Sequence, residues 1–162
     1  MYWRRPRIEF EASLGAANRE AFHQRVCSGA PPGLLAYQDG DAVGWVQVGP
    51  RLDVPNWNGK RRLTAATPDA PAEDPCVWGV SCFAVKGSCR RRGIARALLL
   101  GAMGWAREND ARSLDACPVD RSEKTSAASL YHGVASMFRN TGFVEISRRR
   151  ADRPLMRLRL DR

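Results

Sequence analysis

The residues of this chain that are best suited to chemistry form one short basic segment, Arg90-Arg91-Arg92-Gly93-Ile94-Ala95-Arg96. It follows an apolar run at 77–85 and opens an amphipathic stretch at 94–108, so we expect it to join a buried strand to a helix. The first amides of a helix lack intrahelical acceptors and carry partial positive charge, which suits them to bind phosphate. Small side chains at Gly93 and Ala95 allow close approach. The segment therefore predicts an anion-binding site.

The basic segment matches neither of the two common phosphate-binding fingerprints. It lacks both the G-x-x-x-x-G-K-[ST] of a P-loop and the G-x-G-x-x-G of dinucleotide-binding folds. A charged turn, in which Gly93 serves only the backbone geometry, is the alternative interpretation. The segment alone thus predicts an anion but does not specify which one.

The positive net charge of the whole chain is compatible with several kinds of anionic partner. The net charge of +9 favours nucleic acid, an acidic substrate or a phosphate-rich cofactor. Outside the segment, however, the basic residues lie in short scattered clusters at 4–7, 60–62 and 148–153, and no nucleic-acid-binding motif is present. A basic nucleic-acid-binding module is therefore the less favoured alternative.

Other site types have little support in the sequence. The five cysteines are odd in number and include no C-x-x-C pair, and only two histidines are present, so we expect neither a disulfide framework nor a metal site. No signal peptide or membrane-spanning apolar run is visible, so we expect a cytoplasmic protein without membrane association.

The elements that must position the basic segment follow from hydrophobic periodicity and from turn residues. We expect a single α/β domain over residues 1–162. Its predicted elements are a helix at 17–27, strands at 34–38 and 42–48 joined by a turn at Asp39-Gly40-Asp41, a surface loop at 50–75 with a helical turn near 61–65, a strand at 77–85, a helix at 94–108, a strand at 114–119, a helix at 126–140, and strands at 143–146 and 155–160. The central strand–helix–strand unit should be parallel and right-handed.

With motif and element order together, the chain resembles the GNAT superfamily of N-acetyltransferases. Residues 90–95 match its acetyl-CoA signature, [RQ]-x-x-G-x-[GA], and the order of elements matches from 17 to 160. The chain is also similar to a poorly characterised bacterial subgroup, whose recurring features lie at 1–4, 31–37, 43–45 and 133–138. The resemblance implies a GNAT-like fold with a mixed, mostly antiparallel sheet flanked by helices. It also implies direct transfer of an acetyl group from acetyl-CoA to a primary amine.

The resemblance further implies which residues hold acetyl-CoA. Amides from Arg91 to Arg96 would bind the pyrophosphate, and the backbones of Phe83 and Val85 would pair with the pantetheine arm. The thioester would lie where the strands at Val85 and Leu114 splay apart. The implied cofactor-binding residues are Phe83, Val85, Arg90, Arg91, Arg92, Gly93, Ile94, Ala95, Arg96 and Phe138.

One departure from the family pattern concerns the general acid. Many GNAT enzymes carry a tyrosine where this chain has Phe138, which cannot donate a proton and would pack against the cofactor arm. Tyr131, at the place of a frequent asparagine, is the candidate hydroxyl, with an ordinary half-buried tyrosine as the alternative. The acids expected near the cleft are Asp115, Asp120, Glu123 and Glu145, and Asp120 is the first choice for a general base.

Trp45 and Arg51 are the candidates for lining the acceptor site, although a core tryptophan and a solvated arginine are the alternatives. The acceptor itself, a small-molecule or peptide amine, is not specified by any residue. Because Phe138 replaces the usual acid, a non-catalytic acyl-CoA-binding sensor of the same fold is a further alternative. Dimers are common in the superfamily, so a homodimer is one assembly that the resemblance allows.

Overall fold

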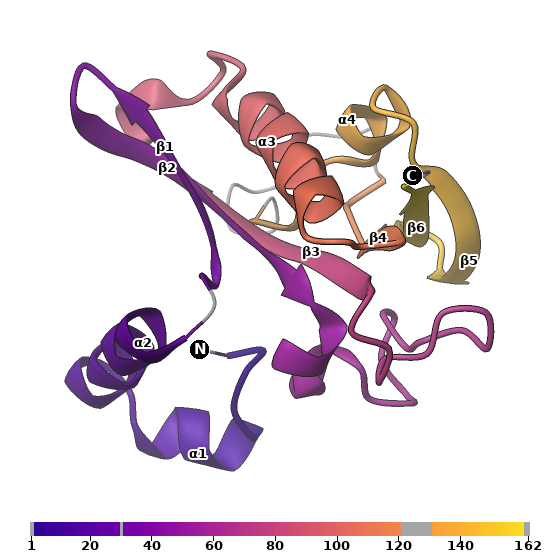
Figure 1. Cartoon of the computed structure of the whole chain (residues 1–162), viewed down its shortest axis with the longest axis horizontal. Coiled ribbons are helices and arrows are strands. Elements are labelled where there is room, and N and C mark those ends of the chain that lie inside the picture. The colour runs from indigo at the N-terminus through magenta and orange to yellow at the C-terminus, as the bar shows by residue number, and fades with distance from the viewer. Residues whose placement is uncertain (1, 30, 121–130, 161–162) are drawn as a thin grey trace.

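Six strands form one mixed sheet in the computed structural model, which describes residues 2–29, 31–120 and 131–160 (Figure 1). In chain order the strands are β1 (Gly33–Gln38), β2 (Asp41–Pro50), β3 (Val77–Val85), β4 (Ser113–Ala116), β5 (Val144–Arg150) and β6 (Arg153–Arg159). Their order across the sheet is β1-β2-β3-β4-β6-β5. Among these strands β3 and β4 alone pair in parallel. The predicted mixed, mostly antiparallel sheet is confirmed.

The long helix α3 (Ile94–Glu108) covers one face of the sheet (Figure 1). Both β3 and α3 begin and end at the predicted residues, because a continuous apolar run and a helical apolar stripe are the clearest periodic signals. Ile94 and Leu98 approach Gly44 so closely that a side chain at Gly44 would meet them at 2.9 and 3.0 Å. The even-numbered side chains of β2 that precede Val48 therefore face α3, and the odd-numbered ones face the opposite side.

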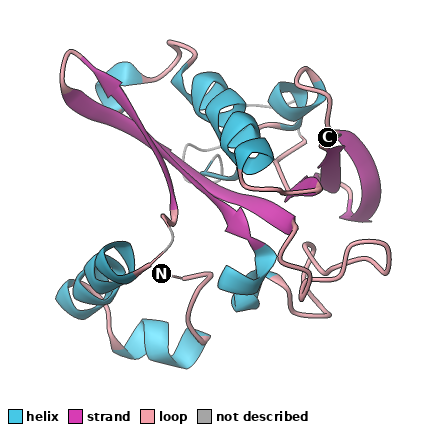
Figure 2. Cartoon of the chain, viewed as in Figure 1, coloured by secondary structure: helices cyan, strands magenta, loops and turns pink. Residues whose placement is uncertain are grey.

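The segment between β2 and β3 covers part of that opposite face, which corrects the predicted surface loop. Its helical turns lie at Arg51–Asp53 and Pro55–Trp57 rather than near 61–65 (Figure 2). Trp57 is fully buried and packs on Gly79 of β3, where a side chain would meet its ring at 2.7 Å. Val54, Cys117 and Leu155 join Trp57 in a second apolar cluster.

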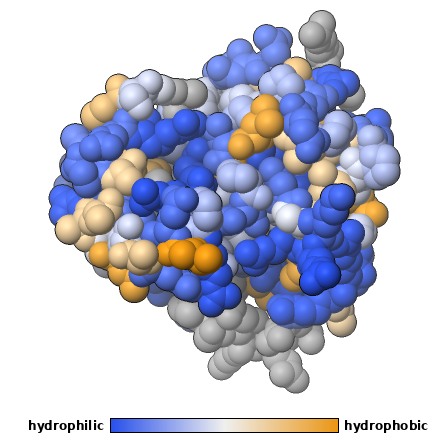
Figure 3. Space-filling model, turned by 90° about the horizontal axis from the view of Figure 1, so that it is seen from below, coloured by the Kyte–Doolittle hydropathy of each residue, from blue (hydrophilic) through white to orange (hydrophobic). Residues whose placement is uncertain are grey.

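The helices α1 (Arg7–Ala12) and α2 (Ala16–Ser28) lie on the same side as this second cluster, away from α3 (Figure 1). The predicted helix at 17–27 is confirmed, but its apolar residues do not form a core face, because Asn18 is its one buried residue. From below, the molecular surface is largely hydrophilic, with hydrophobic side chains in small separate groups (Figure 3). Polar contacts and one aromatic pair hold α2 in place, as described below.

The C-terminal half differs from prediction where the chain leaves β4. The strand expected at 114–119 ends at Ala116, and Val119 forms only an isolated parallel bridge with Val134. The helix expected at 126–140 is reduced to α4 (Ala135–Arg139), while 126–130 lie outside the described residues. Gly133 has a φ of 76° and Val134 is extended, so the helix cannot continue through them. No helix among the described residues is long and apolar enough to cross a bilayer.

Candidate active site

The predicted anion-binding segment forms the entrance to α3. A short turn at Gly87–Cys89 precedes it, Arg91 has a φ of 61°, and Gly93 has a φ of 79° immediately before the first turn of α3. Positive φ values at two positions fold the backbone back on itself, and such bends turn successive amides toward one place. The amides of residues 91–96 find no acceptor within the described part of the chain. This set of donors fits an anionic group.

Four arginine side chains lie near these amides and leave them accessible to a ligand. Arg90, Arg91, Arg92 and Arg96 are all exposed. Arg90 donates from its Nε to the carbonyl of Val85 at 3.4 Å, a long and exposed contact. The guanidinium groups thus leave the amides accessible and add positive charge close to them.

Among the described residues, nothing pairs in a ladder with the outer edge (the free edge) of the second half of β3, directly beside this segment. Parallel pairing with β4 stops at Val80 and Ala116, whereas β3 continues to Val85. On its other side β3 stays paired with β2, with an irregularity that leaves Ser81 without a partner in the register. The pairing of the two strands therefore ends before Val85, and the backbone of Phe83 and Val85 lies along the open side. An extended ligand can add to such an edge as another strand would.

Aromatic side chains pack beneath the unpaired half of β3. The ring of Phe83 contacts that of Phe138 on α4 at 6.2 Å between centroids, and Phe138 contacts Phe143 at 5.0 Å. Phe138 is fully buried. Phe138 therefore packs in the core beneath the free edge. As a phenylalanine it offers no polar atom for catalysis.

Tyr131 and His132 lie side by side where the free edge begins. Their rings are 3.9 Å apart, and His132 makes a hydrogen bond to the backbone of Ser81 on β3. Tyr131 lies before Gly133 and therefore outside α4, so it is not carried by the predicted helix. Burial raises the pKa of Tyr131, although 40% of the side chain is exposed. The phenol therefore keeps its proton and can donate it.

His132 is a residue that the sequence analysis did not select. Burial lowers its pKa to about 3, Arg153 lowers it further, and the hydrogen bond to Ser81 opposes both effects. The imidazole is therefore neutral at neutral pH. A lone histidine within a predicted helix carries no signal in the sequence, because the contact of His132 with β3 depends on the break at Gly133.

We expect the ring resonances of His132 to stay unchanged between pH 8 and 5 in an NMR titration. Because the unfolded histidine takes up a proton near pH 6.5 and the folded one does not, the free energy of unfolding should fall as the pH drops from about 6.5 toward 3. This contribution changes by up to about 1.4 kcal/mol per pH unit. Urea unfolding at pH 7 and 5 should show a smaller pH effect in His132→Gln than in wild type. An equal effect in both would contradict the assignment, and the exposed His23→Gln is the matched control.

Asp120 is held by two arginines. Arg139 donates to both carboxylate oxygens at 3.1 and 2.6 Å, and Arg148 donates at 2.7 Å. The hydrogen bonds from Arg139 and then Arg148 lower the pKa of Asp120 to about 2. A carboxylate that gives up its proton so readily is a weak base near neutral pH. This geometry argues against the predicted role as general base and gives Asp120 the role of joining α4 to β5.

Two of the other acids considered as general bases also bind arginine side chains. Glu145 receives two hydrogen bonds from Arg148, which lower the pKa of its carboxyl. Asp115 is fully buried and binds both Arg51 and Arg157. Glu123 lies outside the described residues.

Arg51 lies in the core rather than on an acceptor site. Its guanidinium stacks over Trp57 at 5.0 Å, donates to Asp115 at 2.6 Å, and contacts the carbonyl of Thr64 and the side chain of Asn58. No part of the residue is exposed, and burial lowers its pKa. The predicted acceptor contact at Arg51 is therefore wrong, and the residue ties the 50–75 segment to β4 instead.

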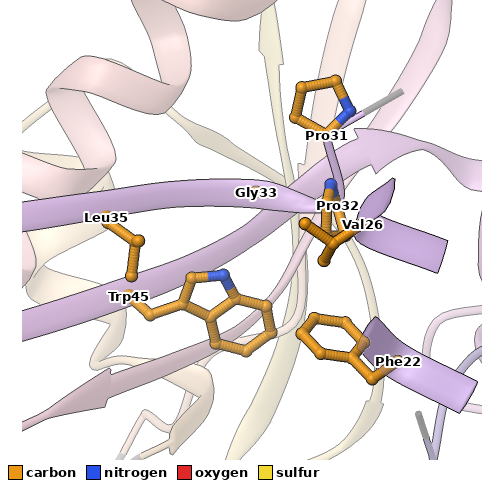
Figure 4. A pocket seen from close by; sticks show the side chains of 7 residues that line it. All are labelled: Phe22, Val26, Pro31, Pro32, Gly33, Leu35 and Trp45. Atoms are coloured by element: carbon orange, nitrogen blue, oxygen red, sulfur yellow. The ribbon is translucent and has the colours of Figure 1, made fainter. Parts of the chain in front are cut away.

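Trp45 faces away from α3 and lines a cavity of about 380 Å³ between α2 and the β1–β2 hairpin (Figure 4). Its indole meets the ring of Phe22 edge-on at 6.0 Å. The other side chains around the cavity are also apolar: Val26, Pro31, Pro32 and Leu35. Trp45 is thus half-buried at an accessible cavity, while Arg51 is enclosed.

A parallel strand pair in which one strand runs on unpaired, with unpaired amides at a helix N-terminus beside its open end, defines the class of acyl-CoA N-acyltransferase folds. The chain belongs to the acetyltransferase (GNAT) family, whose family model matches residues 2–134. This assignment confirms the resemblance drawn from residues 90–95 and makes the chain an acetyltransferase. Comparison with curated protein sequences finds no match.

Solved structures share the fold at low sequence identity. The ribosomal-protein-alanine N-acetyltransferase from Brucella melitensis is 21% identical, with a TM-score of 0.58 over 91% of this chain and 80% of that chain. A GNAT-family acetyltransferase from Streptococcus pneumoniae is 17% identical, with a TM-score of 0.56 over 91% and 78%. The protein yncA from Salmonella typhimurium, solved with its cofactor acetyl-CoA, is 17% identical, with a TM-score of 0.55 over 91% and 75%.

Proposed function

We propose that this acetyltransferase moves an acetyl group from acetyl-CoA directly to a primary amine. Two features at one end of β3 carry the proposal: amides at residues 91–96 and a strand edge through Val85, neither of which is paired within the described parts of the chain. The amides suit a pyrophosphate, and the edge suits an extended arm with amide groups of its own. Acetyl-CoA carries both groups in that order and supplies the activated acetyl group.

The residues of this chain divide the work of binding. The amides from Arg91 to Arg96 would hold the pyrophosphate, with Arg90 and its neighbours adding charge. The backbones of Phe83 and Val85 would pair with the pantetheine arm. Phe138 would support the arm indirectly, as part of the buried floor below Phe83.

Tyr131 is the residue we propose as proton donor to the departing thiolate. It lies at the start of the free edge, its raised pKa keeps it protonated, and its partial exposure leaves the hydroxyl reachable. The amine nitrogen attacks the thioester carbonyl, the carbon–sulfur bond breaks, and the sulfur takes the phenolic proton. The proton that the nitrogen loses as the amide forms returns to the phenolate of Tyr131. The proton of the acceptor ammonium passes to water, because the carboxylates of Asp120 and Glu145 bind arginines and hold protons weakly.

We expect Tyr131→Phe to lower kcat by about a hundredfold at neutral pH, since general-acid groups commonly contribute that much. The KM for acetyl-CoA should change less than twofold, because the phenol does not hold the cofactor. Tyr37→Phe, at an exposed tyrosine of β1, is the matched control. An unchanged kcat in Tyr131→Phe would remove Tyr131 from the chemistry and leave protonation of the thiolate to solvent.

The test of the function itself is turnover. Purified protein is incubated with acetyl-CoA and a panel of primary amines, and free thiol and N-acetylated product are measured together. Equal amounts of both establish transfer. Binding of acetyl-CoA without product for any amine would favour the sensor. Absence of acetyl-CoA binding, with salt-sensitive binding to polynucleotide, would favour the nucleic-acid module instead.

A further inference from the structure

The cavity beside Trp45 is open because α2 is not seated on the sheet by hydrophobic packing. Asn18 is the one buried residue of α2, while Val26 remains 49% exposed. Instead, Arg25 pairs with Asp53, which also binds Arg4, and Phe22 meets Trp45 edge-on. These contacts keep the helix beside the hairpin and leave about 380 Å³ between them. That volume is at the small end of those that bind ligands.

Two rows of side chains connect this cavity to the free edge of β3. One row is Leu35, Trp45 and Ala84, which lie opposite one another on β1, β2 and β3. The other row, directly beside it, is Gly33, Gln47 and Cys82. Residues paired in this way point to the same face of a sheet. Neighbouring strands are about 4.8 Å apart, so Trp45 is one such spacing from the strand whose edge is free.

Gln47 places a polar group between the cavity and the free edge. Its side chain is almost fully buried, yet its Nε2 has no hydrogen-bond partner among the described residues. A buried amide group without a partner is costly, and a ligand oxygen that accepts from it removes that cost. From β1 toward β3, the face thus carries a mainly apolar cavity, then the unpartnered amide of Gln47, then the strand edge.

We infer that this cavity binds the apolar part of the acetyl acceptor, and that the acceptor class is a primary amine carrying an aromatic or branched aliphatic group. The inference rests on the proposed function, because the free edge is where the thioester would lie. An amine seated over Ala84 or Cys82 has its apolar group within reach of Trp45, Phe22 and Val26. Burying that group covers cavity surface that α2 leaves open.

The first experiment compares 2-phenylethylamine and isoamylamine with ethanolamine and putrescine as acceptors at saturating acetyl-CoA. We expect kcat/KM to be about tenfold to a hundredfold higher for the two apolar amines, the range that one apolar group produces in a fitted pocket. Val26→Asp puts a charge into the cavity wall at a half-exposed position. It should raise the KM for 2-phenylethylamine about tenfold, while the KM for ethanolamine and the Kd for acetyl-CoA stay within twofold.

Val144→Asp is the matched control, because Val144 is 62% exposed on β5, away from the cavity. It should change none of these constants. Equal kcat/KM for all four amines, or a loss in Val26→Asp that is the same for apolar and polar amines, would overturn the inference while the acetyltransferase function stands. Absence of acetyl-CoA binding in wild type would instead overturn the function on which it rests. A dimer in sedimentation that Val26→Asp dissociates would assign the cavity to a second copy of the chain and likewise overturn the inference.

Discussion

Replacing Gly93 with aspartate is expected to weaken acetyl-CoA binding by about a hundredfold, or ~2.8 kcal/mol. The φ of 79° at Gly93 is one that other residues adopt with strain, and nothing lies within 4 Å of the position that a side chain would take. The new carboxylate can therefore be accommodated. It lies close to the amides of residues 91–96, whose N–H groups produce a positive potential there. Its charge repels a pyrophosphate and competes for the same donors.

Calorimetric titration of acetyl-CoA into wild type and Gly93→Asp measures this loss. Gly104→Asp is the control, since Gly104 belongs to the same helix, is equally free of neighbours, and lies about 16 Å farther along the axis. It should bind acetyl-CoA as wild type does. Equal affinity in all three proteins would remove the cofactor from the entrance of α3. No binding to wild type would remove it from the protein.

Asp115→Ala is expected to produce the largest loss of stability, about 3–5 kcal/mol, with a fall in Tm of roughly 10 °C. Asp115 is fully buried and neutralises two arginines, with Arg51 at 2.6 Å and Arg157 at 2.7 Å. Removing the carboxylate leaves Arg51 as an unpaired charge that cannot reach water. The uncompensated charge, rather than the lost attraction, accounts for most of the effect.

Urea unfolding of Asp115→Ala beside Asp69→Ala checks this account. Asp69 also binds Arg157, at 2.7 Å, but it is exposed, so water replaces it and the loss should stay below about 1 kcal/mol. The double variant Asp115→Leu with Arg51→Met should recover much of the lost stability, because it removes the orphaned charge. Similar losses for Asp69→Ala and Asp115→Ala would show that burial does not govern this network.

The parts predicted correctly from sequence are those whose signals are local. Residues 77–85 are apolar at nearly every position and 94–108 repeat at helical spacing, so β3 and α3 are specified by their own residues. The turn at Asp39-Gly40 and the strand-to-helix turn at 90–93 are also local, since both depend on backbone conformations that only a few residue types favour. The motif at 90–95 with this element order was enough to identify the family.

The parts predicted wrongly depend on partners far away in sequence. Arginine is usually a surface residue. Arg51 can be buried because its charge is neutralised by Asp115, which lies 64 positions later in the sequence. The prolines and polar residues of 50–75 are typical of a loop, and nothing local shows that Trp57 fits against Gly79. The helix expected at 126–140 is interrupted at Gly133, so the position of Tyr131 and the contact of His132 with Ser81 could not be read from helical spacing.

The parallel pairing of β3 and β4 has a mechanical consequence. The two halves of the sheet, β1–β3 and β4–β6, are joined by four residue pairs, from Val77 with Ser113 to Val80 with Ala116. A change of angle at such a short seam would produce a larger change of width at Val85. Asp115 is the third of the four pairs, and its two arginines come from either half. The ion network therefore joins the two halves of the sheet at this seam as well as stabilising the core.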